Sequence, residues 1–244
     1  MLLKSVRIES ERFPSITDYP FNLNLFRSTP MLHFTHPICF FVGENGSGKS
    51  TLLEAIVRKC NIHIWVSPKR HMVHANPYET DLFKYLMLDW ANGPAKGSLF
   101  SAATFYEFAD LLDDVAINDP GQLKYFGGQL INKLSHGQGT LSYFEGRYRF
   151  PGLHLMDEPE AALSPSSQAR LVRLLHSLRN QSNTQFIIAT HSPILLSLPG
   201  AQIFSFDGER ICETTFERTQ TFQLYREFMT DPTAFLKSNE RATG

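Results

Sequence analysis

Residues 43–50 read Gly-Glu-Asn-Gly-Ser-Gly-Lys-Ser, and this stretch decides the fold of the 244-residue chain. It fits G-x-x-x-x-G-K-[ST], the pattern of a phosphate-binding loop. The apolar run Ile38 to Val42 precedes the loop, and Thr51 to Ile56 begins a helix after it. The backbone N–H groups of such a loop and the positive end of the helix favour a bound polyphosphate. The sequence therefore predicts an α/β fold built around a nucleotide-binding core at residues 38–66.

Two side chains of this loop are expected to make specific contacts. Lys49 is expected to reach the β- and γ-phosphates, and the Ser50 hydroxyl is expected to ligate Mg²⁺, which otherwise keeps waters and phosphate oxygens. A glycine-rich turn that contains Lys-Ser by chance is the alternative. The position of the loop between a buried strand and a helix disfavours that alternative, because phosphate binding needs this junction.

Composition and charge indicate an ordinary globular protein. Lysine plus arginine number 23 against 24 aspartates and glutamates, so the formal charge of −1 gives no global basic field for nucleic acid or an anionic membrane. Three widely spaced cysteines without a C-x-x-C pair fit reduced thiols better than a disulfide framework. Neither a signal peptide nor a run of about eighteen apolar residues is found. These features predict a cytoplasmic protein with no direct membrane insertion.

The first part of the chain is expected to form an antiparallel β layer (1–37), the core around the loop (38–66) and a short helical insertion (67–140). In the β layer, Leu3–Glu9 and Phe21–Phe26 alternate apolar and polar residues, which is typical of strands. The other elements predicted here are a strand at Asn61–Val66 and helices at Asp81–Trp90 and Ser101–Val115.

The second part, residues 141–244, is expected to complete the core. Ser164-Pro165 begins a helix with a capping hydroxyl and a proline at its first position, and leucines then follow at helical spacing. The other predicted elements are buried strands at Leu153–Met156 and Phe186–Ala189, a hairpin of Ile203–Phe206 and Arg210–Glu213 with a tight turn at Asp207-Gly208, and a helix at Phe222–Leu236. Residues 1–244 are thus expected to form a single domain.

Three further motifs follow the loop in a fixed order. They are Leu-Ser-His-Gly-Gln at residues 134–138, Leu-Met-Asp-Glu-Pro at 155–159 and Ala-Thr-His at 189–191. They resemble the LSGGQ signature, the Walker B strand with its glutamate, and the switch histidine of ABC-type P-loop ATPases, with His136 in place of the first signature glycine. Residues 157–165 and 190–193 are more similar to the compact stand-alone predicted ATPases of bacteria than to transporter cassettes, which usually carry Thr-Ser-Ala-Leu-Asp after the proline.

The resemblance implies Mg²⁺-dependent ATP hydrolysis on a mostly parallel sheet. Asp157 would hold Mg²⁺ together with Ser50, and the neighbouring Glu158 would orient or deprotonate the attacking water. His191 would contact the γ-phosphate or that water, and Lys49 would join these two residues in catalysis. The residues expected to contact ATP are Gly43, Glu44, Asn45, Gly46, Ser47, Gly48, Lys49, Ser50 and Thr51.

The resemblance also implies a homodimer that forms on ATP binding. In the family, the signature completes the ATP site of a second subunit, so Ser135, His136, Gly137 and Gln138 are expected to serve a partner chain in a head-to-tail dimer. A helix over residues 138–145 would turn its positive N-terminal end toward the partner's phosphate.

Two features depart from the family pattern. No glutamine occurs between Ser50 and Gly121, so the residue that relatives place beside Mg²⁺ is missing; the candidates to replace it are His71, His74 and Ser67. The aromatic residue that stacks on adenine in transporters is unassigned, with Tyr19 and Phe21 as candidates by position. ATP is favoured over GTP because no Asn-Lys-x-Asp guanine motif occurs.

The motifs specify ATP chemistry better than they specify a biological role. The leading interpretation is a soluble ATPase that uses dimer closure as a conformational signal. The alternatives are the ATP-binding subunit of a membrane transporter, and a nucleotide-dependent sensor in DNA repair or phage defence with a protein or DNA partner. Two arginine pairs, Arg147 with Arg149 and Arg170 with Arg173, are interpreted as solvated faces rather than as a DNA-binding patch.

Overall fold

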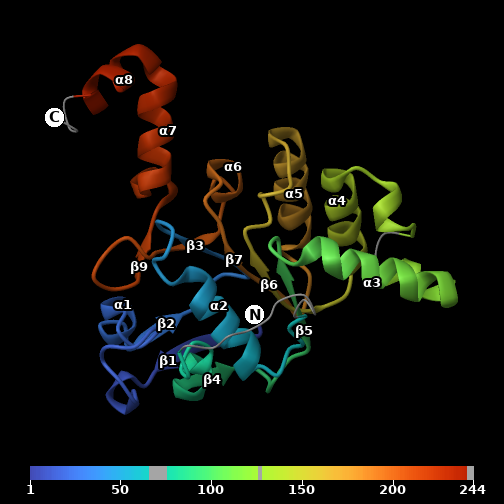
Figure 1. Cartoon of the computed structure of the whole chain (residues 1–244), viewed down its shortest axis with the longest axis horizontal. Coiled ribbons are helices and arrows are strands. Elements are labelled where there is room, and N and C mark those ends of the chain that lie inside the picture. Colours follow the sequence, from blue (N-terminus) through green and yellow to red (C-terminus); the bar gives the residue numbers. More distant parts are fainter. Residues whose placement is uncertain (66–75, 126–127, 241–244) are drawn as a thin grey trace.

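The computed structural model describes residues 1–65, 76–125 and 128–240, and two β-sheets form its centre (Figure 1). In the described part of the chain the larger sheet has six strands in the order β5-β6-β7-β3-β8-β9, and all neighbouring pairs except β8 and β9 are parallel. Its strands are β3 (Ile38–Val42), β5 (Gly97–Ser101), β6 (Gly152–Asp157), β7 (Thr184–Ala189), β8 (Gln202–Ser205) and β9 (Cys212–Thr214). The predicted mostly parallel α/β core is confirmed.

The second sheet is the predicted antiparallel layer, with a strand from an unexpected region. It contains β1 (Leu3–Ile8), β2 (Met31–His33) and β4 (Leu86–Trp90) in the order β2-β1-β4. The helix predicted at Asp81–Trp90 is wrong beyond Tyr85, because a 3₁₀ helix at Asp81–Tyr85 leads directly into β4. Pairing with β1 from Ile8 to Leu3 satisfies the β4 backbone, so tertiary pairing overrides the helical spacing of its apolar residues.

Two glutamine side chains join the antiparallel layer to the large sheet. The Gln185 amide on β7 accepts the backbone N–H groups of Leu2 and Leu3 at 2.9 and 2.8 Å and donates to the Leu3 carbonyl at 3.0 Å. Gln202 on β8 donates to the His33 carbonyl at 3.0 Å. Both side chains are buried, and they hydrogen-bond residues at the start of β1 and the last residue of β2.

Two other predicted strands are absent from the structure. Phe21–Phe26 leads into helix α1 (Asn24–Arg27), because Phe21, Leu25 and Phe26 are buried together at helical rather than alternating spacing. Within Asn61–Val66 the described residues 61–65 form no strand, and Val66 lies outside the described part. The sheet edge beside β6 is instead occupied by β5, a strand not predicted from the sequence.

The helices cover the large sheet on its two faces, and α7 and α8 project from the body (Figure 1). The remaining α-helices are α2 (Lys49–Lys59), α3 (Phe105–Asn118), α4 (His136–Arg147), α5 (Pro165–Leu178), α6 (Pro193–Leu196), α7 (Gln220–Thr230) and α8 (Pro232–Glu240). Further 3₁₀ helices lie at Ser10–Arg12, Pro120–Tyr125, Ile131–Lys133 and Phe216–Arg218. Among the described helices, none has the length and apolar character needed to cross a membrane.

The single helix predicted at Phe222–Leu236 is wrong, because the chain breaks between α7 and α8. Pro232 cannot donate a backbone hydrogen bond to the preceding turn. The Asp231 carboxylate accepts the N–H groups of Thr233 and Ala234 at 3.1 and 2.9 Å and so begins the next helix. The hairpin of β8 and β9 is confirmed, but six residues separate its strands, so the predicted tight turn is wrong.

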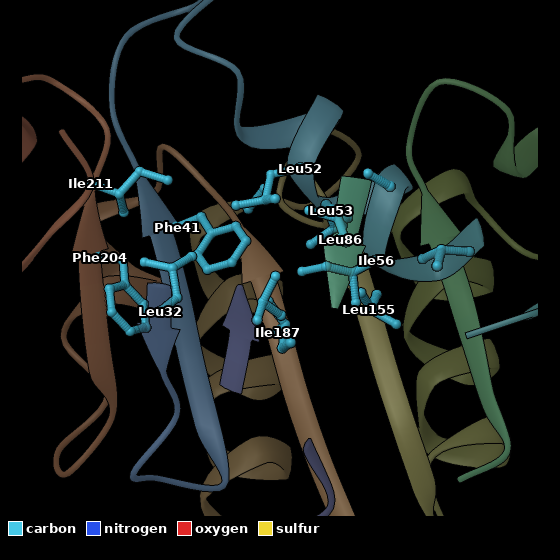
Figure 2. Packing of buried hydrophobic residues seen from close by; sticks show 14 of the residues in the cluster. Leu32, Phe41, Leu52, Leu53, Ile56, Leu86, Leu155, Ile187, Phe204 and Ile211 are labelled. Carbon is cyan, nitrogen blue, oxygen red and sulfur yellow. The ribbon is translucent and has the colours of Figure 1, made fainter. Parts of the chain in front are cut away.

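Two separate apolar clusters lie on opposite faces of the large sheet. Alternate residues of β3 enter different clusters: Cys39 and Phe41 join one, and Ile38, Phe40 and Val42 join the other. The first cluster, between α2 and both sheets, includes Leu32, Phe41, Leu52, Leu53, Ile56, Leu86, Leu155, Ile187, Phe204 and Ile211 (Figure 2). The second contains residues of α3, α4, α5 and α6. Helix α2 and helix α4 therefore cover different faces of the same sheet.

Candidate functional site

The loop between β3 and α2 has a backbone that only glycine adopts readily. Gly46 and Gly48 have φ values of 79° and 100°, in the left-handed region. A Cβ atom on Gly48 would lie 2.9 Å from Cζ of Phe26, so the space is also closed to a side chain. The loop follows buried β3 and ends at the first residue of α2. The predicted strand, loop and helix thus occur in the predicted order.

Lys49 is buried at the start of α2 and turns back over the loop. Its Nζ donates to the carbonyl oxygens of Gly43 and Glu44 at 2.7 and 2.9 Å. Burial lowers the pKa of Lys49, and the carboxylates of Glu158 and Asp157 oppose that shift. The side chain is therefore placed to exchange carbonyl contacts for contacts with an anion held in the loop.

Ser50 and Asp157 bring two oxygen ligands together from elements that are distant in sequence. The Ser50 hydroxyl donates to Asp157 Oδ1 at 2.8 Å, and Asp157 is the last residue of β6. Burial raises the pKa of Asp157 to about 6, the Ser50 hydrogen bond opposes the shift, and the neighbouring Glu158 charge adds to it. A hydroxyl beside a carboxylate is a donor set that fits Mg²⁺, which prefers oxygen ligands and would stabilise the charged form of Asp157.

Glu158 and His191 lie beside each other at the ends of the adjacent strands β6 and β7. Glu158 has a φ of 49°, which is uncommon outside glycine, and its N–H donates to the Ala189 carbonyl at 2.9 Å. His191 Nε2 lies 3.8 Å from Glu158 Oε1. That nitrogen is buried and has no hydrogen-bond partner in the part of the chain described here. The structure thus brings a carboxylate and an imidazole with an unsatisfied nitrogen to the edge that also carries Asp157.

The signature motif lies at the first turn of α4 and is exposed. The Ser135 N–H donates to Gln138 Oε1 at 3.2 Å, so the Gln138 side chain caps its own helix. The His136 ring lies 4.2 Å from the Tyr106 ring of α3. Ser135, His136 and Gln138 are exposed and Gly137 is half-buried. Because α4 packs on the face of the sheet opposite α2, the structure does not bring the motif to the chain's own phosphate-binding loop.

Sequence reasoning missed an aspartate that fixes the segment before the signature. Both carboxylate oxygens of Asp113 on α3 are acceptors, for the backbone N–H groups of Ile131 and Asn132, each at 2.8 Å. These residues begin the 3₁₀ helix that precedes Leu134. Asp113 is nearly buried, so it is a strong structural link between the α3 segment and the signature. No signal near Asp113 in the sequence indicates this contact.

Asp207 is a second missed residue, and it contacts the phosphate-binding loop. Its Oδ1 accepts the N–H of Glu44 at 2.8 Å, and Oδ2 accepts the Ser205 hydroxyl at 3.1 Å. The sequence predicts Asp207 in a tight turn. The carboxylate instead supports the loop from the end of β8, the strand next to β3.

The two candidates for adenine stacking differ in their exposure. Phe21 is fully buried, where its ring packs at 5.2 Å on Tyr85, so the proposed stacking role for Phe21 is wrong in this structure. Tyr19 is exposed, and its hydroxyl hydrogen-bonds the hydroxyl of Thr51, the residue after the loop motif. Tyr19 thus remains a candidate. The candidates for the missing glutamine, His71, His74 and Ser67, lie outside the described residues.

Comparisons with known proteins agree with this geometry. Residues 21–58 match a family model described as "AAA domain", and residues 139–197 match one described as "AAA domain, putative AbiEii toxin, Type IV TA system". A protein of Geobacter sulfurreducens named "Putative ABC transporter ATP-binding protein" is 29% identical over 66% of this chain and 61% of its own length. The chain therefore spans about six tenths of that relative.

A curated and a solved protein extend the comparison. The thiamine import ATP-binding protein ThiQ of Haemophilus influenzae is 26% identical, over 65% of this chain and 83% of ThiQ. The structure of CbiO1 from Clostridium perfringens, part of an ABC transporter complex, matches with a TM-score of 0.52 at 15% identity, covering 86% of this chain and 90% of CbiO1. The last match concerns the fold alone. Together with the motifs in their predicted order, these findings support a P-loop ATPase of the ABC/AAA type.

Proposed function

We propose that residues 1–244 form one ATPase domain that binds ATP with Mg²⁺ and hydrolyses it in a head-to-tail homodimer. The observation that carries this proposal is the meeting of Ser50 and Asp157 at 2.8 Å, beside Glu158 and next to the phosphate-binding loop. Phosphoryl transfer to water needs an anion cradle, a metal ligand set and a water-orienting group at one place. We assign all three roles to one edge of the sheet, where the loop, the Ser50–Asp157 pair and Glu158 lie together.

The residues that hold the nucleotide are those of the loop and its flanks. Backbone N–H groups of residues 46–51 would cradle the phosphates, and Lys49 would neutralise the β- and γ-phosphates. Tyr19, beside Thr51, is our candidate for the base contact. Ser50 and Asp157 would hold Mg²⁺, which when bound neutralises charge that develops on the phosphate oxygens.

Hydrolysis is assigned to Glu158 and His191. Glu158 would orient the water and accept its proton, and its backbone at φ 49° lies in a sparsely populated region, as is common at functional sites. His191 Nε2, 3.8 Å from Glu158, would donate to the γ-phosphate or to the water and so hold both in line. The chemistry needs no covalent intermediate on the protein.

The second half of the site is assigned to a partner copy. Ser135, His136, Gly137 and Gln138 are available on the surface at the N-terminus of α4, a helix of the opposite face from α2. Placed over a γ-phosphate, the Ser135 hydroxyl and the free N–H groups of the first helical turn would bind it. Because ADP lacks the γ-phosphate, closure of the dimer would depend on ATP.

The test is sedimentation and turnover of the wild type and of Glu158→Gln with Mg²⁺ plus ATP, ADP or no nucleotide. Glu158→Gln keeps the shape of the side chain and loses its basicity, so turnover should fall by about 10² to 10⁴. The variant should sediment as a dimer with ATP and as a monomer otherwise. Near wild-type turnover would move water activation elsewhere, and an association state that ignores nucleotide would refute the dimer mechanism.

One alternative role is favoured by the relatives. The names of the Geobacter and Haemophilus proteins favour an ATP-binding subunit of an importer, in which the same ATP cycle drives a membrane partner. Purification from cells in mild detergent distinguishes this importer role from a signalling role, in which closure of the dimer is itself the signal. Stable recovery of a membrane protein with the chain supports the importer role, and recovery of the chain without one supports the signalling role.

A further inference from the structure

Glu160 connects the strand that ends at Asp157 to the strand that carries His191. It lies in the segment between β6 and α5, two residues after Glu158. Its Oε1 accepts the backbone N–H of His191 at 2.6 Å. A carboxylate is a stronger acceptor for a backbone N–H than a neutral oxygen, and a short bond of this kind restricts the donor residue closely. The position of the His191 backbone is therefore set by a side chain of the neighbouring motif.

A second contact holds the residue after His191 to the same segment. The Ser192 hydroxyl donates to Gln168 Oε1 at 2.6 Å, and Gln168 Nε2 donates to the Leu163 carbonyl at 3.0 Å. On the other side, the Thr190 N–H donates to the Phe41 carbonyl at 3.1 Å. Residues 190–192 are thus held at each position, and the contact at the central position comes from Glu160.

The position of the Glu160 carboxylate has a free-energy cost that packing does not explain. Its Oε2 is buried and has no hydrogen-bond partner within the described residues. The charge of Glu160 raises the free energy of the charged form of nearby Asp157, and none of the ion pairs found among the described residues includes Glu160. An apolar side chain would fill this place at lower cost, which favours a functional reason for a hydrogen-bond acceptor at this position.

We propose that Glu160 is a positioning residue for ATP hydrolysis, which acts through His191. It holds the His191 backbone so that Nε2 stays beside Glu158, at 3.8 Å, without another hydrogen-bond partner among the described residues. This inference rests on the proposed ATPase function. Without the tether, the segment 190–192 keeps its outer contacts, and the imidazole loses its fixed direction. Binding of ATP should then survive and the chemical step should slow.

The kinetic test compares Glu160→Ala and Glu160→Gln in the wild-type and His191→Ala backgrounds. Glu160→Ala should lower kcat by about 10-fold to 100-fold with little change in KM, the size of effect that a small misplacement causes. Glu160→Gln keeps an acceptor oxygen and should recover most of kcat. With His191→Ala already present, Glu160→Ala should cause no further loss, because the group that it positions is gone. An equal loss in both backgrounds, or a normal kcat in Glu160→Ala, overturns the proposal.

Hydrogen exchange of the His191 amide tests the tether without any turnover. Exchange should be faster in Glu160→Ala than in the wild type, and Glu160→Gln should remain protected. Unchanged protection in Glu160→Ala would contradict the positioning role. If Glu160→Ala does not fold, Glu160→Thr repeats both tests, because its side chain is too short to reach the amide. A wild type that binds but never hydrolyses ATP would contradict the proposed function, and the exchange result would still decide whether Glu160 holds His191.

Discussion

Lys49 is the residue on which nucleotide affinity should depend most. Replacing it by alanine removes the buried ammonium that now contacts the Gly43 and Glu44 carbonyls. Mg·ATP affinity should fall about 10-fold to 100-fold, since hydrogen bonds to a charged group contribute about 1.5–3 kcal/mol. Titration with a fluorescent ATP analogue measures the loss. Lys59→Ala, at the exposed end of the same helix, is the matched control, and equal affinity of the two variants would contradict the assigned site.

At the residue scale, sequence predicts the local parts of the site and misses the distant supports. The loop glycines, Lys49 and Ser50 are readable because one short motif contains the whole anion cradle. Asp207 is not readable, because it contacts Glu44 across 163 residues of sequence. Glu160 is near the Walker B motif, yet its partner is a backbone N–H, which leaves no trace in residue types. Such contacts exist only after the strand order is fixed.

Gln185 shows how one side chain can stabilise the junction of two elements. Gln185→Leu keeps the volume and removes the partners of two N–H groups and one carbonyl at Leu2 and Leu3. Each unpaired buried group costs about 1–3 kcal/mol, so the loss of three partners should lower the free energy of unfolding by about 3 kcal/mol or more. Urea denaturation measures the free energy of unfolding. Gln220→Leu, at an exposed position of α7, should change it little, and a similar small effect at Gln185 would refute this role.

His154 on β6 should make stability dependent on pH. Its Nε2–H donates to the Phe150 carbonyl at 3.0 Å and Nδ1 accepts from the Ser98 hydroxyl at 2.8 Å, so the folded imidazole is neutral. Burial lowers the pKa of His154 from 6.5 to about 4. The unfolded chain therefore takes the proton first. The stabilisation is complete above about pH 6.5 and is lost as pH falls through about 4, by a total of about 3 kcal/mol.

The variant His154→Gln isolates this effect from the other groups that titrate in acid. The difference in free energy of unfolding between wild type and variant should shrink as pH falls from 7 to 4. Urea denaturation at a series of pH values gives that difference. A difference that stays constant over the range would show that the buried imidazole takes its proton as readily in the folded as in the unfolded chain.

At the element scale, continuous apolar runs are the reliable signal. They predict β3, β6 and β7, whose residues are buried on both faces apart from the half-buried Asp157 at the end of β6. Short alternating or mixed segments are ambiguous, and their state depends on which strand edge is vacant. Residues 86–90 become β4 because β1 has a free edge, whereas residues 61–65 find the edge beside β6 occupied by β5. Neither outcome is decided by the segment itself.

For the whole molecule, the central feature is that the phosphate-binding loop and the signature motif lie apart. The phosphate-binding loop leads into α2 on one face of the large sheet, and the exposed signature begins α4 on the other face. A single chain therefore holds the loop, the Ser50–Asp157 pair and Glu158 at one place and the signature at another. The account requires that a second copy completes each site.

Activity of mixed variants tests this requirement most directly. Lys49→Ala spoils the loop and keeps the signature, and Ser135→Arg does the reverse by placing a bulky charge at the exposed start of α4. In a head-to-tail dimer of one copy of each, the intact loop faces the intact signature, so one complete site is rebuilt. The account predicts that each variant alone is inactive and that ATP hydrolysis returns on mixing, with a maximum near equal amounts. Normal hydrolysis by Ser135→Arg alone, merely diluted by added Lys49→Ala, would contradict the shared site.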